Sequence, residues 1–179
     1  MKKVSDIHAI KIIFFITACY VGLWAIRIPT IKDQLQTDYV GVGYIMLSFA
    51  IGSIVAMIFA NALILKTSTK SILTFTLIAE GCLWLPVPFI QELWLFMIFS
   101  FVFGMSYGAF EIACNVYASN LEVREKISMM SGFHAFWSLG VLFGSLITSF
   151  LLEWNYSFIF NILLYLSLIH ISEPTRRVR

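Results

Sequence analysis

Charged residues are scarce in this sequence. Asp, Glu, Lys and Arg make up 12% of its 179 residues, whereas an ordinary soluble domain carries about 25%. Hydrophobic residues make up 60% of the chain, and the mean hydropathy is +0.89. A water-soluble core formed by a chain of this length cannot bury so much apolar surface. The scarcity of charge therefore argues against a soluble domain and predicts an integral membrane protein.

Other absences narrow the class further. The net charge is only +2, so we expect no nucleic-acid partner. The three cysteines (Cys19, Cys82 and Cys114) are odd in number and each falls in an apolar run. This pattern argues against a disulfide framework or a metal site and predicts small buried side chains. We find no hydrolase, nucleotide-binding or cofactor pattern, so we expect a protein that is not an enzyme. No cleavage pattern follows the first apolar run, which predicts a retained helix.

Apolar runs divide the chain into six predicted membrane spans. A helix needs roughly 20 mainly apolar residues to cross a bilayer. The runs cover about residues 9–28, 40–65, 72–90, 93–118, 129–152 and 156–168, the last of them cut short. Pro29 marks an exit or kink after the first run. The sequence therefore predicts an all-α polytopic membrane protein with short loops.

Basic residues in the loops predict the orientation. With the N-terminus in the cytoplasm, Arg27 and Lys32 fall on the outer side. The cytoplasmic side then holds a larger set: Lys2, Lys3, Lys11, Lys66, Lys70, Arg124 and Lys126. We therefore expect a cytoplasmic N-terminus.

Small residues recur at every fourth position on three of the spans. The pairs are Gly52 and Ala56, Gly104 and Gly108, and Gly140 and Gly144. Such spacing lets helix backbones approach closely, so these residues are candidates for helix packing. Because the pattern is common in multi-span proteins, a purely structural role is the leading interpretation.

The last residues differ in character from the rest. LSLIHISEPTR within residues 166–179 resembles the translation of a transposase adapter used in preparing sequencing libraries. We therefore expect residues 1–165 to form a six-helix bundle with a truncated sixth helix, and residues 166–179 to be a non-native tail. A native basic cytoplasmic end is the alternative.

Three segments together resemble the major facilitator superfamily. They are LWAIRIPTIKDQL in the first span, FGMSYGAFEIACNVYASNLE in the fourth and MMSGFHAFWSLGVLFGSL in the fifth. Within that superfamily they are most similar to a bacterial inner-membrane branch resembling the fucose permeases. The resemblance implies the N-terminal half of a twelve-helix carrier, with six helices arranged as two inverted three-helix repeats and a missing C-terminal six-helix half.

The resemblance has two departures. The superfamily's loop after the second span resembles G-x-x-x-D-R-x-G-R-R, but here Leu65 and Ser68 replace the expected Asp and central Gly. Fucose-type permeases also carry an acid in the first span, where this chain has Arg27 and Lys32. A fucose-like coupling scheme therefore does not transfer directly.

Glu111 and Asn115 are the leading candidates for a functional site. An ionisable side chain inside a span is costly and usually faces the bundle interior or an aqueous cavity. At 100° per residue, both side chains share a stripe of the fourth span with Gly104 and Gly108. By resemblance that span lines the transport cavity, so Glu111 is predicted to bind a proton or the solute beside Asn115. A structural hydrogen bond between helices is the alternative.

His134 and Ser138 lie on the fifth span. His134 is expected at a depth similar to that of Glu111, where an imidazole could relay a proton. Ser138 shares its face and could bind a hydroxylated solute. A packed histidine bound to a backbone carbonyl is an equal alternative.

Arg27 follows Tyr20 and Trp24 on one face of the first span, a combination suited to an anionic or sugar-like solute. Snorkelling of Arg27 to the lipid headgroups is the alternative. Glu80 lies mid-span in the third run. It either faces inward beside Gly81 or is protonated, and the sequence alone assigns it no role.

Together these features predict a secondary transporter in a bacterial inner membrane. It would carry a small polar solute, sugar-like and proton-coupled in its most specific form. The partners would be the lipid bilayer, the solute and protons, with no cofactor or metal. The rival interpretations are a six-span homo-oligomeric channel and a membrane scaffold that transports nothing.

Overall fold

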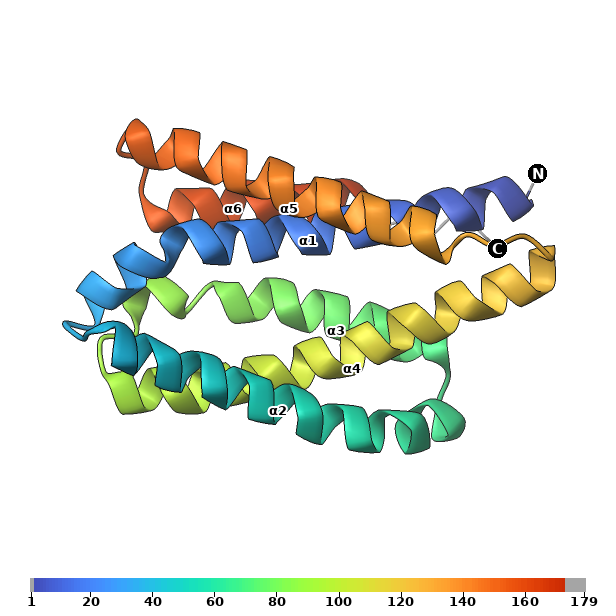
Figure 1. The fold of residues 1–179 in the computed structure, drawn as a ribbon, viewed down its shortest axis with the longest axis horizontal. Helices are drawn as coiled ribbons and strands as arrows, with labels where there is room; N and C mark the ends of the chain where they lie inside the picture. The colour runs from blue at the N-terminus through green and yellow to red at the C-terminus, as the bar shows by residue number, and fades with distance from the viewer. Residues whose placement is uncertain (1, 173–179) are drawn as a thin grey trace. The chain divides into compact units, whose positions relative to one another are not determined.

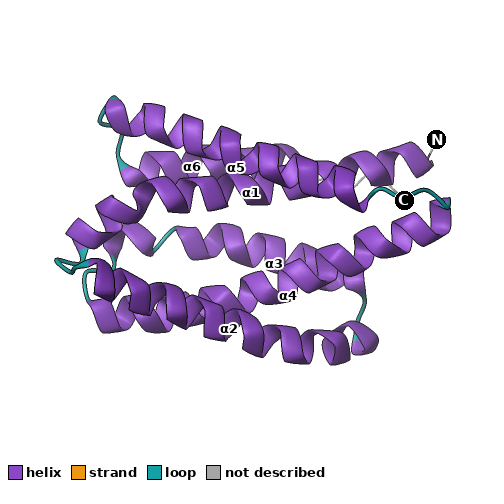
Figure 2. Cartoon of the chain, viewed as in Figure 1, coloured by secondary structure: helices purple, strands orange, loops and turns teal. Residues whose placement is uncertain are grey.

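The computed structural model describes residues 2–172, without the side chains of residues 2–5, 61 and 168–172. These residues form helices and no strand (Figure 2). The elements are α1 (Lys2–Gln34), α2 (Tyr39–Lys66), α3 (Thr69–Trp84), the 3-10 helix η1 (Val87–Phe89), α4 (Leu93–Glu125), α5 (Met130–Glu153) and α6 (Phe158–Ser172). The prediction of an all-α chain is confirmed for this part of the sequence. Residues 173–179, half of the predicted non-native tail, lie outside the described residues.

Five of these helices are long and apolar enough to cross a membrane. The candidate spans are Asp6–Gln34, Tyr39–Ala60, Thr69–Phe89, Leu93–Glu125 and Met130–Glu153. The described apolar part of α6, Phe158–Ser167, is shorter. The chain is therefore a multi-pass membrane protein.

Helix ends differ from the sequence prediction in three places. α1 continues through Pro29 to Gln34, because a proline this close to a helix end interrupts little of the remaining hydrogen-bond ladder. α4 ends at Glu125 and not near residue 118, since hydropathy marks the edge of the apolar run and not the end of the helix. α3 ends at Trp84, and a short 3-10 turn follows at the prolines.

The chain divides into two compact units. The central unit comprises Ile28–Ser119, and the terminal unit comprises Met1–Arg27 with Asn120–Arg179. The central unit therefore contains α2, α3 and most of α4, whereas the terminal unit contains most of α1 with α5 and α6 (Figure 1).

In the central unit, α2 and α4 meet backbone to backbone. A Cβ atom at Gly52 would collide with the carbonyl of Phe101, and one at Gly104 would collide with the carbonyl of Phe49. The end of α1 is tied to this unit by Gln34, whose Nε2 donates to the carbonyl of Val87 at 2.9 Å and to that of Ile90 at 2.6 Å. Only the absence of side chains at the glycines permits this approach of α2 to α4.

In the terminal unit, α1 and α5 meet in the same way. A Cβ atom at Gly140 would collide with the carbonyl of Phe15, and one at Gly144 with the carbonyl of Cys19. α6 is joined to α5 by Tyr165, whose hydroxyl donates to the carbonyl of Gly144 at 2.7 Å. The backbone of Gly144 therefore lies where three helices meet.

One cysteine differs from expectation. Cys19 and Cys114 are buried as predicted, but Cys82 is exposed. Cys82 lies two residues after Glu80 on α3, so its side chain points to a different side of the helix from the buried Glu80. An apolar run predicts contact with lipid as readily as burial in protein, and hydropathy does not separate the two.

Candidate functional site

The predicted polar stripe lies on α4 in the central unit. Gly104 and Gly108 face the backbone of α2, where a Cβ atom would collide with the carbonyl of Phe49 or of Ser53. Glu111 and Asn115 continue this stripe and are both half-buried. The glycine part of the stripe is thus a tight helix contact, and the polar part follows directly after it.

Glu80 on α3 is the most deeply buried acidic side chain near this stripe. Only 6% of it is exposed, and its Oε1 has no hydrogen-bond partner among the described residues. The charge that acts on it electrostatically is that of Glu111. Tyr107 and Cys114 also lie within electrostatic range of both carboxyl groups.

The helical spacing explains this cluster. Tyr107, Glu111 and Cys114 are spaced i, i+4 and i+7, so they share one face of α4. Their common interaction with Glu80 indicates that this face is turned toward α3. The sequence located Glu80 in mid-span but did not reveal Glu111 as its neighbour, because a contact between helices leaves no spacing signal.

Arg27 is held inside the terminal unit. Its Nε donates to Oδ1 of Asn161 at 3.3 Å and its Nη2 donates to the carbonyl of Tyr156 at 3.2 Å. Its guanidinium carbon lies 5.1 Å from the centroid of the Phe158 ring. Because only 3% of the residue is exposed, Arg27 is bound by protein acceptors and an aromatic face. The alternative in which Arg27 snorkels to headgroups does not describe this arrangement.

Asn161 on α6 is the partner that the sequence analysis missed. It is completely buried, and its Nδ2 has no hydrogen-bond partner among the described residues. A single amide inside the apolar run of residues 156–168 was the available signal. The length of that run predicts a helix but does not identify a partner for Asn161.

Tyr20 and Trp24 lie on the same helix as Arg27. Tyr20 is buried, and its ring centroid lies 5.6 Å from that of Tyr165. Trp24 is half-buried. Tyr20 therefore packs against α6, and the predicted stripe on α1 contributes to the interior of the terminal unit.

His134 and Ser138 are both exposed on α5. The ring of His134 meets the ring of Phe14 edge-on, with centroids 5.7 Å apart, and Ser138 Oγ donates to the His134 carbonyl at 3.1 Å. His134 belongs to the terminal unit and Glu111 to the central unit. Their pairing stays a prediction.

Glu122 caps α5 from the last turn of α4. Its Oε1 accepts hydrogen bonds from the backbone N–H groups of Met129 and Met130, the latter at 2.6 Å. A carboxylate at a helix N-terminus satisfies otherwise unpaired donors and is favoured by the helix dipole. The sequence did not predict this contact, because a turn of irregular backbone separates Glu122 from Met129 and Met130.

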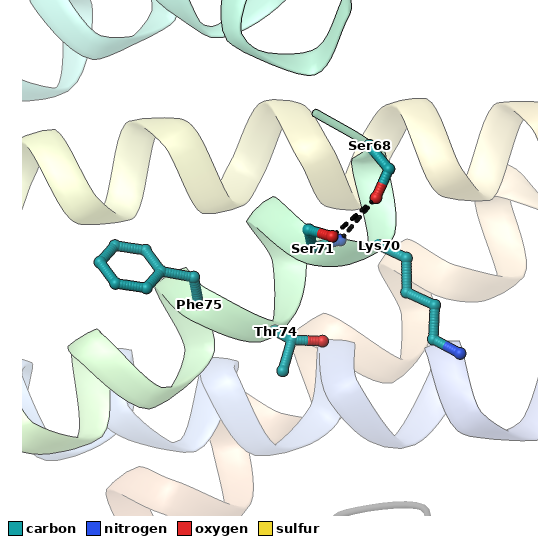
Figure 3. A pocket seen from close by; sticks show the side chains of 5 residues that line it. All are labelled: Ser68, Lys70, Ser71, Thr74 and Phe75. Atoms are coloured by element: carbon teal, nitrogen blue, oxygen red, sulfur yellow. Dashed lines mark hydrogen bonds between the residues drawn. The ribbon is translucent and has the colours of Figure 1, made fainter. Parts of the chain in front are cut away.

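A surface hollow of about 420 Å³ lies at the start of α3 (Figure 3). It is lined by Ser68, Lys70, Ser71, Thr74 and Phe75. Ser68 Oγ caps α3 by accepting from Ser71 N at 3.1 Å, so the polar atoms here serve the helix terminus. None of the predicted site residues lines this hollow.

The side chains that the structure describes include no group of three or more His, Cys, Asp or Glu residues that could hold a metal ion. Around Glu80, the groups within electrostatic range are the carboxyl group of Glu111, the phenol of Tyr107 and the thiol of Cys114.

Comparison with known proteins gives a consistent result. The model of the Major Facilitator Superfamily matches residues 12–175. An uncharacterised MFS-type transporter of Yersinia pestis is 28% identical over 143 residues, which cover 79% of this chain and 37% of that protein. An uncharacterised transporter of Sinorhizobium fredii is 26% identical over 141 residues, which cover 74% of this chain and 35% of that protein. The matched part thus spans little more than a third of each relative's length. No solved structure matches the chain.

Proposed function

Because the chain belongs to the major facilitator superfamily, we propose that it is the N-terminal half of a proton-coupled carrier for a small polar solute. The relatives' greater length supports a second half that would follow these six helices. The full-length carrier would work by alternating access, with two halves that rock about a central site. A sugar-like solute is the narrower form of this proposal.

The observation that carries the proposal is the pair of acids in an apolar bundle. Glu80 is buried and Glu111 is half-buried, and the two interact electrostatically. Ionisable groups inside a membrane protein are costly and mark ion or proton pathways. Glu111 is therefore proposed to take up the transported proton, with Asn115 as a hydrogen-bonding group for the solute on the same stripe.

The remaining candidates have secondary roles in this proposal. His134 and Ser138 are exposed on α5, where an imidazole and a hydroxyl are available to solute or to a proton relay. Arg27, Tyr20 and Trp24 lie in the terminal unit, where Arg27 already has protein acceptors. We assign this group to the support of the bundle rather than to the solute.

The proposed location is a bacterial inner membrane with a cytoplasmic N-terminus. The distribution of Lys and Arg between the loops supports this orientation. Both relatives named above come from bacteria.

The test is uptake by the full-length protein in proteoliposomes with and without an imposed proton gradient. The probes are radiolabelled L-fucose, D-galactose, D-gluconate and L-lactate. We expect accumulation of one probe class only with the gradient. Glu111→Gln should abolish this accumulation but leave solute exchange, because the amide cannot take up a proton.

The rival functions predict other outcomes. A channel would equilibrate solute without concentrating it, and its flux would not saturate. A scaffold would show no flux at all, in wild type or in Glu111→Gln. Either result would refute the carrier proposal.

A further inference from the structure

We propose that Glu80 and Glu111 form one acid pair that holds a single proton between them, so that Glu80 is the second carboxyl group of the transport proton site. This inference rests on the proposed proton coupling and identifies where in the fold the proton resides. Glu80 is a residue for which the sequence suggested no role.

The surroundings of Glu80 leave it few ways to remain ionised. Its side chain is 6% exposed, and Oε1 lacks a hydrogen-bond partner among the described residues. The charged group acting on it is another acid, Glu111. A buried carboxylate without a cation or donor is strongly disfavoured, so a carboxyl group in this position takes up a proton or shares one.

The face of α4 turned toward Glu80 supplies the second half of the pair. Tyr107, Glu111 and Cys114 share this face and interact electrostatically with Glu80. All three partners are acids or neutral weak acids, so these side chains offer Glu80 no countercharge. Glu111 is the one carboxyl group among these three.

Two neighbouring carboxyl groups behave as a unit. The first proton neutralises one group, and the second group can then remain ionised because it no longer faces a like charge. Uptake of the transported proton then forms one O–H bond at Glu111 with a proton from hydronium, which becomes water, and release breaks that bond, with no electron transferred. The pair therefore changes by one unit of charge per cycle, which is the requirement for coupling to a single proton.

The different exposure of the two carboxyl groups suggests that they have different roles. Glu111 is half-buried, whereas Glu80 is shielded, so Glu111 is the group better placed to exchange a proton with its surroundings. Glu80 would therefore retain the shared proton and raise the cost of ionising the pair. Glu80 would favour protonation of the pair, and Glu111 would bind and release the transported proton.

The first test is infrared spectroscopy of the purified full-length protein, which needs no solute. The variants are Glu80→Gln, Glu111→Gln and the double substitution, with Glu92→Gln as the control because Glu92 is an exposed acid before α4. We expect a band from a protonated carboxyl group in the wild type near neutral pH. Each single substitution should shift or remove it, the double substitution should remove it, and the control should leave it unchanged. A wild type without this band, or a Glu80→Gln spectrum identical to that of wild type, would overturn the pair.

The second test is proton-driven accumulation of the probe that the wild type takes up. Glu80→Gln and Glu111→Gln should each reduce accumulation to passive equilibration while exchange continues. The double variant should be no worse than either single variant, because the two groups act as one site. Full accumulation in Glu80→Gln together with its loss in Glu111→Gln would overturn the pair and leave the proposed function intact. If the wild type concentrates no probe, the proposed function fails, and the infrared result alone decides the pair.

Discussion

The central and terminal units are built by the same packing device and differ in how they accommodate a buried ionisable group. In each unit, glycines bring one helix against the backbone carbonyls of another, α2 with α4 and α1 with α5. The terminal unit surrounds Arg27 with two acceptors and an aromatic ring. The central unit places Glu80 beside another acid and leaves one of its oxygens without a partner among the described residues.

This difference distinguishes a buried ion that is held by hydrogen bonds from a buried acid that lacks one. An arginine keeps its charge in proteins, and Arg27 donates to two protein acceptors that would lose their donor without it. A buried acid with an unsatisfied oxygen gains from each proton that it takes up. The terminal unit therefore holds its buried ion in contacts between helices, whereas the proposed proton site lies in the central unit.

The largest expected effect comes from the packing that both units share. Gly104→Val in the central unit or Gly144→Val in the terminal unit should lower the free energy of unfolding by about 3 kcal/mol, because the new side chain meets a backbone carbonyl that cannot move aside. Thermal unfolding of the purified full-length protein measures this loss.

Each glycine substitution has a matched control in its own unit. Gly43 on α2 and Gly132 on α5 have no neighbouring atom within 4 Å of an added Cβ. Gly43→Val and Gly132→Val should therefore leave stability within about 0.5 kcal/mol of wild type. Equal losses at test and control positions would contradict the close-contact explanation.

Removal of each buried ion tests the contrast directly. Arg27→Met should destabilise the protein by about 2 kcal/mol, because Asn161 Oδ1 and the Tyr156 carbonyl lose their donor. Glu80→Met should stay within about 1 kcal/mol of wild type or be more stable, since it replaces an unsatisfied acid with an apolar group of similar size. Chemical and thermal unfolding of the two variants should rank them in this order. A larger loss for Glu80→Met would show that the acid is a structural group after all.

A smaller effect is expected at the amide beside Arg27. Asn161→Asp places a carboxylate next to the guanidinium and removes the buried Nδ2 donor, so it should stabilise the protein by about 1 kcal/mol. Asn120→Asp, at an exposed position on α4, should change little. If Asn161→Asp destabilises the protein in unfolding measurements, the guanidinium is already compensated by its neutral acceptors.

The smallest effect is expected at the α4–α5 turn. Glu122→Gln should slightly lower the thermal unfolding temperature, because an amide oxygen is a weaker acceptor than a carboxylate for the N–H groups of Met129 and Met130. The control is Glu153→Gln at the C-terminal end of α5, where a negative charge is not favoured by the helix dipole. Lower stability in this control than in Glu122→Gln would argue against the cap.

Much of the fold could be predicted from composition and hydropathy. Apolar runs located the six helices, because a span must satisfy its backbone internally and therefore has a characteristic length. The ends were less predictable. α4 continues past residue 118 into Leu121, which is buried, and polar residues on either side of it. A helix that leaves the apolar layer keeps its hydrogen bonds while its hydropathy changes.

The candidate site was predictable only in part. Glu111 and Glu80 could each be identified as an acid in an apolar run, since the cost of such a residue is a property of one helix. Their proximity could not, because it depends on which face of α4 meets α3. Asn161 shows the same limit. An amide in a membrane span indicates that it has a polar partner, but the sequence does not identify that partner as Arg27, which lies 134 residues away.

The division of the chain also bears on the order in which its parts can assemble during synthesis. The central unit is one continuous stretch, Ile28–Ser119, whereas the terminal unit requires both Met1–Arg27 and Asn120–Arg179. All segments of the central unit therefore leave the ribosome before α5 and α6 exist. The first part of α1 can meet Gly140 and Gly144 only after α5 has been made. A nascent chain halted after α4 would thus contain every segment of the central unit and a first helix still without α5.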